Sequence, residues 1–187
     1  MILPRAFAGL RLLSMALRSL YMRSYLKLAH PGVSCHRTVR FGRGVAIRCF
    51  AGAHIEIGKG SVIQDYALVI AEGGKLVIGD DCLIGRGCVL VCTEAISVGQ
   101  GTLIAEYVTI RDQDHVHSAE AALETQGLIS APIVIGRNVW LGAKVTVTKG
   151  VEIAEHAVVG ANAVVTRSLP QRGIYGGVPA RLLAPNG

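Results

Sequence analysis

The stretch "IGRNVWLGAKVTVTKGVEIAEHAVVGANAVV", residues 135–165, carries an aliphatic residue at every sixth position. A period of six is neither the 3.6 residues of an α-helix nor the alternation of a lone strand. A small or β-branched side chain follows four residues after each of the first five, and glycine often comes directly after the aliphatic residue. Each hexad therefore indicates a short strand and a tight turn, with both marked side chains facing inward. The aliphatic positions are Ile135, Leu141, Val147, Ile153, Val159 and Val165.

The same pattern runs through earlier parts of the chain, starting at Ile57, Ile78 and Val98. Strands at this spacing stack as coils of a parallel β-helix, in which each coil provides hydrogen-bond partners for the next. We expect the glycines after the aliphatic residues to serve the turn geometry, since glycine tolerates it. These glycines are Gly58, Gly79, Gly85, Gly99, Gly136, Gly142 and Gly160.

The cysteines fit the same pattern and indicate neither a disulfide framework nor a zinc site. There are five, an odd number, and none forms a CxxC pair. Cys82 and Cys88 occupy the small inward position of their hexads, which predicts that they pack in the core. Free thiols favour a reducing compartment, so we expect a cytoplasmic protein.

The positive charge is concentrated at the N-terminal side. The net charge is +6, yet residues 1–55 hold nine Lys or Arg and no acidic residue. Such an arm attracts anionic partners, among them phospholipid headgroups or an acidic glycan. Nothing in the sequence resembles a nucleic-acid-binding module. Arginines interrupt the apolar residues, which disfavours a membrane span or a secretory signal; the composition also fits a mitochondrial transit peptide.

Three regions follow from these patterns. Residues 1–32 form a basic arm with a helix from Pro4 to Ala29, which ends before Pro31. One apolar face of this helix must pack on the end of the β-helix, on a neighbouring subunit, or on an anionic membrane surface. Residues 33–169 form the β-helix, and 170–187 form a tail.

One stretch, "IRDQDHVHSAEAALETQGLISAPIVIG" at residues 110–136, interrupts the hexads. It predicts a loop at about 116–132 that protrudes from the coils and a return to the β-helix at Ile133. Long loops on a solenoid are more often functional than ornamental, and this one begins among aspartates and histidines. We therefore expect chemistry at its root.

The chain from Phe41 to Leu183 resembles the hexapeptide-repeat acyltransferases, most specifically in "IGRNVWLGAKVTVTKGVEIAEHAVVGANAVVTRSLPQRGIYGGVPARLL". The resemblance implies an all-β, left-handed parallel β-helix, a homotrimer, and direct acetyl transfer from acetyl-CoA without a covalent enzyme intermediate or a metal. It places the catalytic base, which removes the proton from the acceptor hydroxyl, at His115.

The resemblance also implies binding residues. The pantetheine arm of acetyl-CoA would contact Gly142, Ala143 and Ala161, and its phosphates or adenine would lie near Thr166, Arg167 and Arg181. Position 167 commonly carries Lys in this pattern, and here the charge is kept with a different geometry. Lys149 and Trp140 are further candidates beside the coenzyme. For the acceptor or for orienting the base, the candidates are Asp112, Asp114, Glu94 and His117.

Four functions remain open from the sequence. The first is an O-acetyltransferase acting on a sugar or a surface-polysaccharide precursor, and the second transfers acetyl to an amino sugar. The third is a zinc enzyme resembling the γ-type carbonic anhydrases, which would need His115 and His117 with His54 or His156 as ligands. The fourth is a β-helix scaffold without catalysis.

Overall fold

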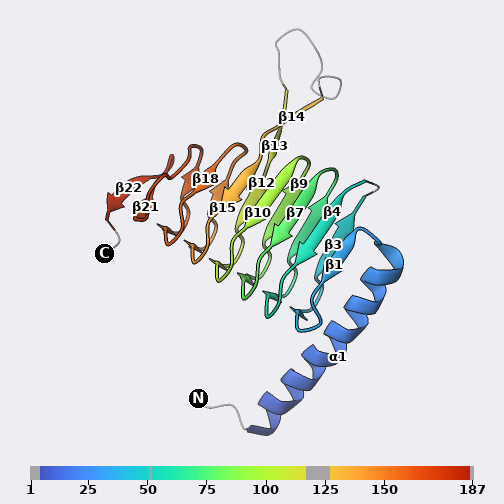
Figure 1. The fold of residues 1–187 in the computed structure, drawn as a ribbon. Helices are drawn as coiled ribbons and strands as arrows, with labels where there is room; N and C mark the ends of the chain where they lie inside the picture. The colour runs from blue at the N-terminus through green and yellow to red at the C-terminus, as the bar shows by residue number, and fades with distance from the viewer. Residues whose placement is uncertain (1–4, 51, 117–126, 186–187) are drawn as a thin grey trace.

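The computed structural model describes residues 5–50, 52–116 and 127–185, with side chains of the N-terminal helix from residue 13 onward. The chain winds into a left-handed parallel β-helix with one N-terminal helix and one protruding hairpin, which confirms the predicted fold class (Figure 1). Three sheets form its sides, parallel throughout except for the antiparallel pair of the last two strands, and coils stack from the N-terminal end to the C-terminal end.

Each coil contributes one strand to each side of the β-helix. The first sheet contains β1 (Val33–Cys35), β4 (His54–Ile57), β7 (Lys75–Ile78), β10 (Ala95–Val98), β15 (Ile133–Ile135) and β18 (Glu152–Ile153). The second contains β2 (Arg40–Phe41), β5 (Val62–Ile63), β8 (Leu83–Ile84), β11 (Leu103–Ile104), β16 (Trp140–Leu141), β19 (Val158–Val159), β21 (Ile174–Gly176) and β22 (Arg181–Ala184). The third contains β3 (Ala46–Cys49), β6 (Leu68–Ala71), β9 (Val89–Cys92), β12 (Thr109–Arg111), β17 (Thr146–Val147) and β20 (Val164–Val165).

The core is a column of aliphatic side chains at the predicted hexad positions. Ile104, for example, pairs in register with Ile84 on one side and Leu141 on the other, and all three are fully buried. The small positions four residues later are buried as well, including Cys82 and Cys88 as predicted. Burial raises the pKa of the Cys88 thiol to about 11, so this side chain packs as a neutral core residue.

The glycines after the aliphatic residues serve a different purpose from the one expected. The residue with positive φ, the conformation that glycine tolerates best, is the third after the aliphatic position. Examples are Asn138 with φ 53° and Gly101 with φ 70°. All of these glycines except Gly160 are needed because the next coil lies against them. A Cβ on Gly99 would stand 2.6 Å from the carbonyl carbon of Gly136, closer than atoms can pack.

Helix α1 (Arg5–Ala29) ends where predicted and covers the open end of the first coil. Leu26 is buried against the core, and the Phe41 backbone N–H donates to Ser19 Oγ over 2.9 Å. The Arg23 guanidinium donates to the Val39 carbonyl over 3.0 Å. Within the described part of the chain, no helix has the length and hydropathy that crossing a bilayer requires.

The protrusion starts earlier than predicted, because it is a β-hairpin rather than an irregular loop. Strand β13 (Gln113–His115) pairs antiparallel with β14 (Leu128–Ser130), with Asp114 opposite Ile129. His115 is therefore a strand residue of the hairpin stem. The β-helix resumes at Ile133, as predicted.

Candidate active site

The hairpin leaves the β-helix at a corner that is held by a buried carboxylate. Asp112 Oδ1 accepts the backbone N–H of Thr93 over 2.8 Å, and Oδ2 accepts those of Glu94 and Ala95 over 2.8 and 2.9 Å. The residue is fully buried, so these three donors replace water around its charge. Asp112 was a candidate for the acceptor site or for orienting the base, but its oxygens accept hydrogen bonds from the backbone at the corner of the preceding coil. Neither role is supported by its position.

Cys92 packs beside this carboxylate and is completely buried. Burial, and then the charge and hydrogen bond of Asp112, raise its pKa to about 12. The thiol stays protonated at neutral pH and does not provide a nucleophile.

A row of polar side chains behind the hairpin root was not recognised in the sequence. Thr93 Oγ1 donates to Gln113 Oε1, and Gln113 Nε2 donates to Glu72 Oε2 over 3.2 Å. All three residues stand third after an inward aliphatic residue, in three successive coils. This shared hexad position is the signal that could have identified them. The row ties Gln113, the first residue of the hairpin, to the two coils before it.

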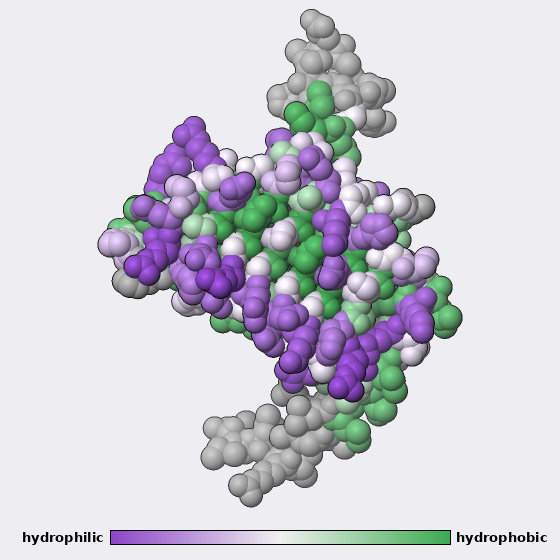
Figure 2. Space-filling view, in the orientation of Figure 1, coloured by the Kyte–Doolittle hydropathy of each residue, from purple (hydrophilic) through white to green (hydrophobic). Residues whose placement is uncertain are grey.

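His115 faces a pocket of about 520 Å³ at the side of the hairpin stem. Asp114, Val116, Ile129 and Lys149 line it with His115, and the imidazole is exposed to solvent. Figure 2 shows the apolar stem of the hairpin above the coils. The pocket therefore combines a titratable base with apolar walls and a pair of opposite charges.

Two contacts tie the hairpin stem to neighbouring coils. The Lys149 ammonium pairs with the Asp114 carboxylate, so this predicted coenzyme cation lies at the hairpin pocket. Ser130 Oγ donates to Glu94 Oε2 over 2.8 Å. Asp114, Glu94 and Lys149 thus converge on the root that presents His115. His117 lies outside the described residues.

The predicted main-chain contacts for the pantetheine arm gather at the corner between the second and third sheets. Ala143 and Ala161 lie in successive coils, where the Asn162 N–H donates to the Ala143 carbonyl over 2.9 Å. Gly142 lies so close to the coil above that an added Cβ would stand 2.7 Å from the Ala161 nitrogen. Trp140 comes two residues earlier on the outer face of β16, with 53% of its surface exposed. The coils therefore bring these four residues together.

The predicted phosphate-binding residues lie around the last coil. Thr166 and Arg167 follow β20 directly, at the corner that carries Lys149 one coil earlier, and both are exposed. Arg181 begins β22, where the Ala180 N–H donates to the Val164 carbonyl over 2.8 Å. Among the described residues, neither arginine forms an ion pair with a carboxylate, so both charges are available to an anion.

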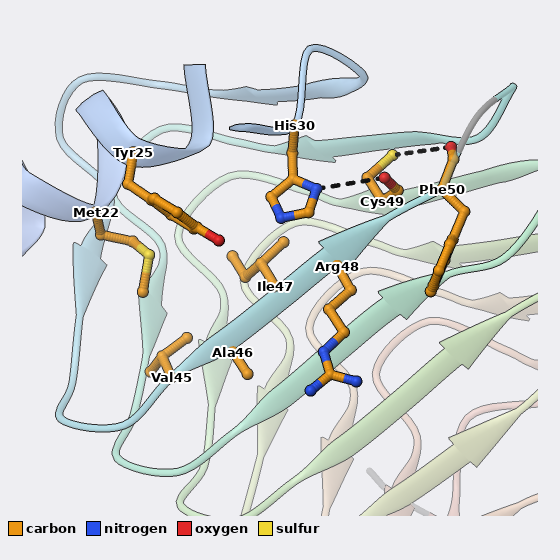
Figure 3. Close-up of a pocket in the computed structure, with 9 residues that line it drawn as sticks. All are labelled: Met22, Tyr25, His30, Val45, Ala46, Ile47, Arg48, Cys49 and Phe50. Carbon is orange, nitrogen blue, oxygen red and sulfur yellow. Dashed lines mark hydrogen bonds between the residues drawn. The ribbon is translucent and has the colours of Figure 1, made fainter. Parts of the chain in front are cut away.

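A larger groove, of about 580 Å³, lies between α1 and β3, and its lining residues come from a part of the sequence well before His115. Figure 3 shows Met22 and Tyr25 extending from the helix toward Val45 and Ile47. The His30 ring nitrogen Nδ1 lies 3.3 Å from the Cys49 carbonyl oxygen. Its lining is mostly apolar, with His30 and Arg48 as the polar side chains, and no carboxylate lines it among the described residues.

In the part of the chain that the structure describes, no group of three or more His, Cys, Asp or Glu side chains could hold a metal ion. His54 and His156 lie on strand β4 and at the corner before β19. His117, the remaining ligand of the zinc hypothesis, is outside that part.

Two family models match the chain. One, described as "Bacterial transferase hexapeptide (six repeats)", covers residues 132–167, and the other, "Hexapeptide repeat of succinyl-transferase", covers residues 75–105. Both matched ranges consist of stacked coils in the structure.

The chain is similar to curated and solved proteins of this kind. It is 34% identical to the probable acetyltransferase Rv3034c of Mycobacterium tuberculosis, over 84% of this chain and 53% of that protein, so it spans about half of that relative. It is 31% identical to the putative colanic acid biosynthesis acetyltransferase WcaF of Escherichia coli, over 74% of this chain and 71% of that one. A hexapeptide-repeat acetyltransferase of Vibrio cholerae, solved with acetyl-CoA, is 25% identical with a TM-score of 0.57, over 93% of this chain and 87% of that chain. With its coils, its hairpin and these similarities, the chain belongs to the hexapeptide-repeat acyltransferase family.

Proposed function

We propose that the protein is an O-acetyltransferase that moves an acetyl group from acetyl-CoA to a hydroxyl of a sugar or of a surface-polysaccharide precursor. The observation that carries the proposal is the exposed His115 on a hairpin stem anchored to three coils. Membership of the family supports the reaction class, and the polysaccharide context named for WcaF supports the class of acceptor.

His115 would act as the general base. The imidazole takes the proton from the acceptor hydroxyl while that oxygen attacks the thioester carbonyl carbon. The C–S bond then breaks, and the leaving sulfur receives the proton, which gives the acetyl ester and free CoA. No enzyme nucleophile takes part, in agreement with the protonated Cys92 near the hairpin root.

The coenzyme would lie along the last coils. The corner of Gly142, Ala143 and Ala161 offers main-chain atoms without bulky side chains, which suits the narrow pantetheine arm. Arg167 and Arg181 offer guanidinium groups for the phosphates, since neither forms an ion pair with a carboxylate in the described part of the chain. Trp140 offers an exposed aromatic face, which supports a contact near the coenzyme.

The Asp114–Lys149 pair and Glu94 would shape the acceptor side of the pocket. Asp114 is adjacent to His115 in β13, and its carboxylate is held by Lys149, so it is placed to accept a sugar hydroxyl. Glu94 is held in turn by Ser130. Both carboxylates stay partly open to solvent and so keep acceptor capacity for hydrogen bonds.

We also propose a homotrimer that packs through the second sheet. In-register pairing aligns a row of outward apolar residues across this sheet, and an apolar row of this kind favours contact with another subunit. The row consists of Val62, Leu83, Leu103, Trp140, Val158 and Ile174.

The test compares His115→Ala with wild type in acetyl-CoA binding, by calorimetry, and in acetyl transfer over a panel of sugars and amino sugars. We expect binding to be kept and turnover to fall by about 10²–10⁴-fold, the usual contribution of a general base. His54→Ala, an exposed histidine on β4, is the matched control and should retain activity. Full turnover in His115→Ala would exclude the base role, and a wild type that does not bind acetyl-CoA would exclude the transferase.

A further inference from the structure

The side of α1 that faces away from the β-helix carries large apolar side chains. Five of them are between 57% and 86% exposed, and at about 100° per residue they fall within one arc of the helix. Figure 2 shows apolar side chains of α1 at the lower right of the molecule. A helix face in contact with water ordinarily carries polar residues, so this arc lacks its partner in the single chain. We call it the outer stripe; its residues are Leu13, Leu17, Leu20, Tyr21 and Leu28.

The outer stripe continues sideways into the groove between α1 and β3. The rings of Tyr21 and Tyr25 stack with centroids 6.5 Å apart, and Tyr25 lines the groove together with Phe50, which is 54% exposed (Figure 3). Tyrosine has an apolar ring and a polar hydroxyl, a combination that suits a boundary between water and an apolar phase. The apolar surface is thus wider than the helix alone.

The outer stripe belongs to a strongly basic part of the chain. No acidic residue occurs before Glu56, and seven basic side chains are described between residues 13 and 55. Among the described residues, Arg43 alone of these seven forms an ion pair with a carboxylate, that of Asp65. The others are Arg18, Arg23, Lys27, Arg37, Arg40 and Arg48.

We propose that α1 docks on the surface of an anionic phospholipid bilayer. The outer stripe enters the boundary between headgroups and acyl chains, and the basic residues beside it meet the phosphates. A symmetric contact between two copies of α1 fits less well, because it would bring together two helices that carry basic but no acidic side chains from residue 13 onward. The proposal uses no residue of the hairpin pocket and does not depend on the proposed activity.

The test is co-sedimentation of the full chain with vesicles of phosphatidylcholine alone and of phosphatidylcholine mixed with phosphatidylglycerol. We expect binding to the mixed vesicles to be on the order of 100-fold tighter, as a few basic residues near an anionic surface would give. Raising NaCl from about 0.1 M to about 1 M should weaken it strongly, because the Debye length falls to about 3 Å.

Leu17→Gln/Leu20→Gln removes apolar surface without changing the charge, and glutamine keeps a good helix propensity. We expect binding to the mixed vesicles to fall at least about tenfold. The matched control, Ala16→Gln/Ala29→Gln, introduces the same residue at exposed positions of the same helix outside the stripe and should bind as wild type. Light scattering gives the particle mass of every variant. The proposal is overturned by a wild type that ignores anionic vesicles, by unchanged binding of the leucine variant, or by a leucine variant whose particle mass falls, since a second copy would then cover the stripe.

Discussion

Asp112 and Asp114 stand two residues apart and have opposite environments. Asp112 is fully buried and accepts three backbone N–H groups, whereas Asp114 is exposed and meets Lys149. In Asp112→Ala these donors lose their acceptor inside the protein, and we expect the free energy of unfolding to fall by about 3 kcal/mol or more. Urea unfolding measures the loss. Asp114→Ala is the control and should lie within about 1 kcal/mol of wild type, because exposed ion pairs contribute little; equal losses in the two variants would contradict the anchoring role.

The sequence could not separate these two aspartates. Both lie shortly after Ile110, the last aliphatic hexad position before the interruption, and both are close to histidines in the sequence. What distinguishes them is the corner at Thr93–Ala95, which faces Asp112 only after the coils have stacked. A residue whose partners are backbone groups some eighteen positions away leaves no local signal of its burial.

At the scale of the strand and its turn, most of the glycines that directly follow an aliphatic residue are required by the distance between coils. In Gly99→Ala the new Cβ would stand 2.6 Å from the Gly136 carbonyl carbon, and both are backbone-fixed. We expect a loss of about 2–3 kcal/mol in the free energy of unfolding, typical of overpacking. Gly160→Ala is the control at the same hexad position. Its nearest neighbour would be the Tyr175 carbonyl oxygen at 3.3 Å, so its stability in thermal unfolding should change by less than about 1 kcal/mol.

The hexads predict the strands well because inward aliphatic residues are needed in every coil, whatever the rest of the sequence does. The six aliphatic residues at hexad positions from Ile135 to Val165 are all buried, as the period predicts. The hairpin was predicted only as an interruption of the hexads. Its antiparallel pairing joins two short segments, Gln113–His115 and Leu128–Ser130, that are separated in the sequence and carry no local pairing signal. The site was predicted in the same uneven way: His115 and the last coils follow from the resemblance, while Gln113 and its polar row depend on stacking between coils.

Over the whole molecule, each coil contacts mainly the coil before and the coil after it. Among the described strands, β3 pairs only with β6, for example, whereas β12 pairs with both β9 and β17. A terminal coil therefore has one open side, and solenoids require a cover there. Helix α1 provides it at the N-terminal end through Leu26, Ser19 and Arg23. The inner face of the helix thus has a structural task, which leaves its outer stripe for a separate contact.

Leu26→Ala should loosen this cover. Leu26 is 1% exposed and packs in the core cluster, so truncation costs about 2–5 kcal/mol through lost burial and a cavity. Because coils couple mainly to their neighbours, we expect hydrogen exchange to accelerate at residues 33–49 and to remain slow at residues 133–165. Leu28→Ala, only two residues away but 86% exposed, is the matched control and should leave both regions protected. Uniform acceleration along the chain in Leu26→Ala would mean that the coils unfold as one unit, and that the helix stabilises the whole β-helix rather than its first coils.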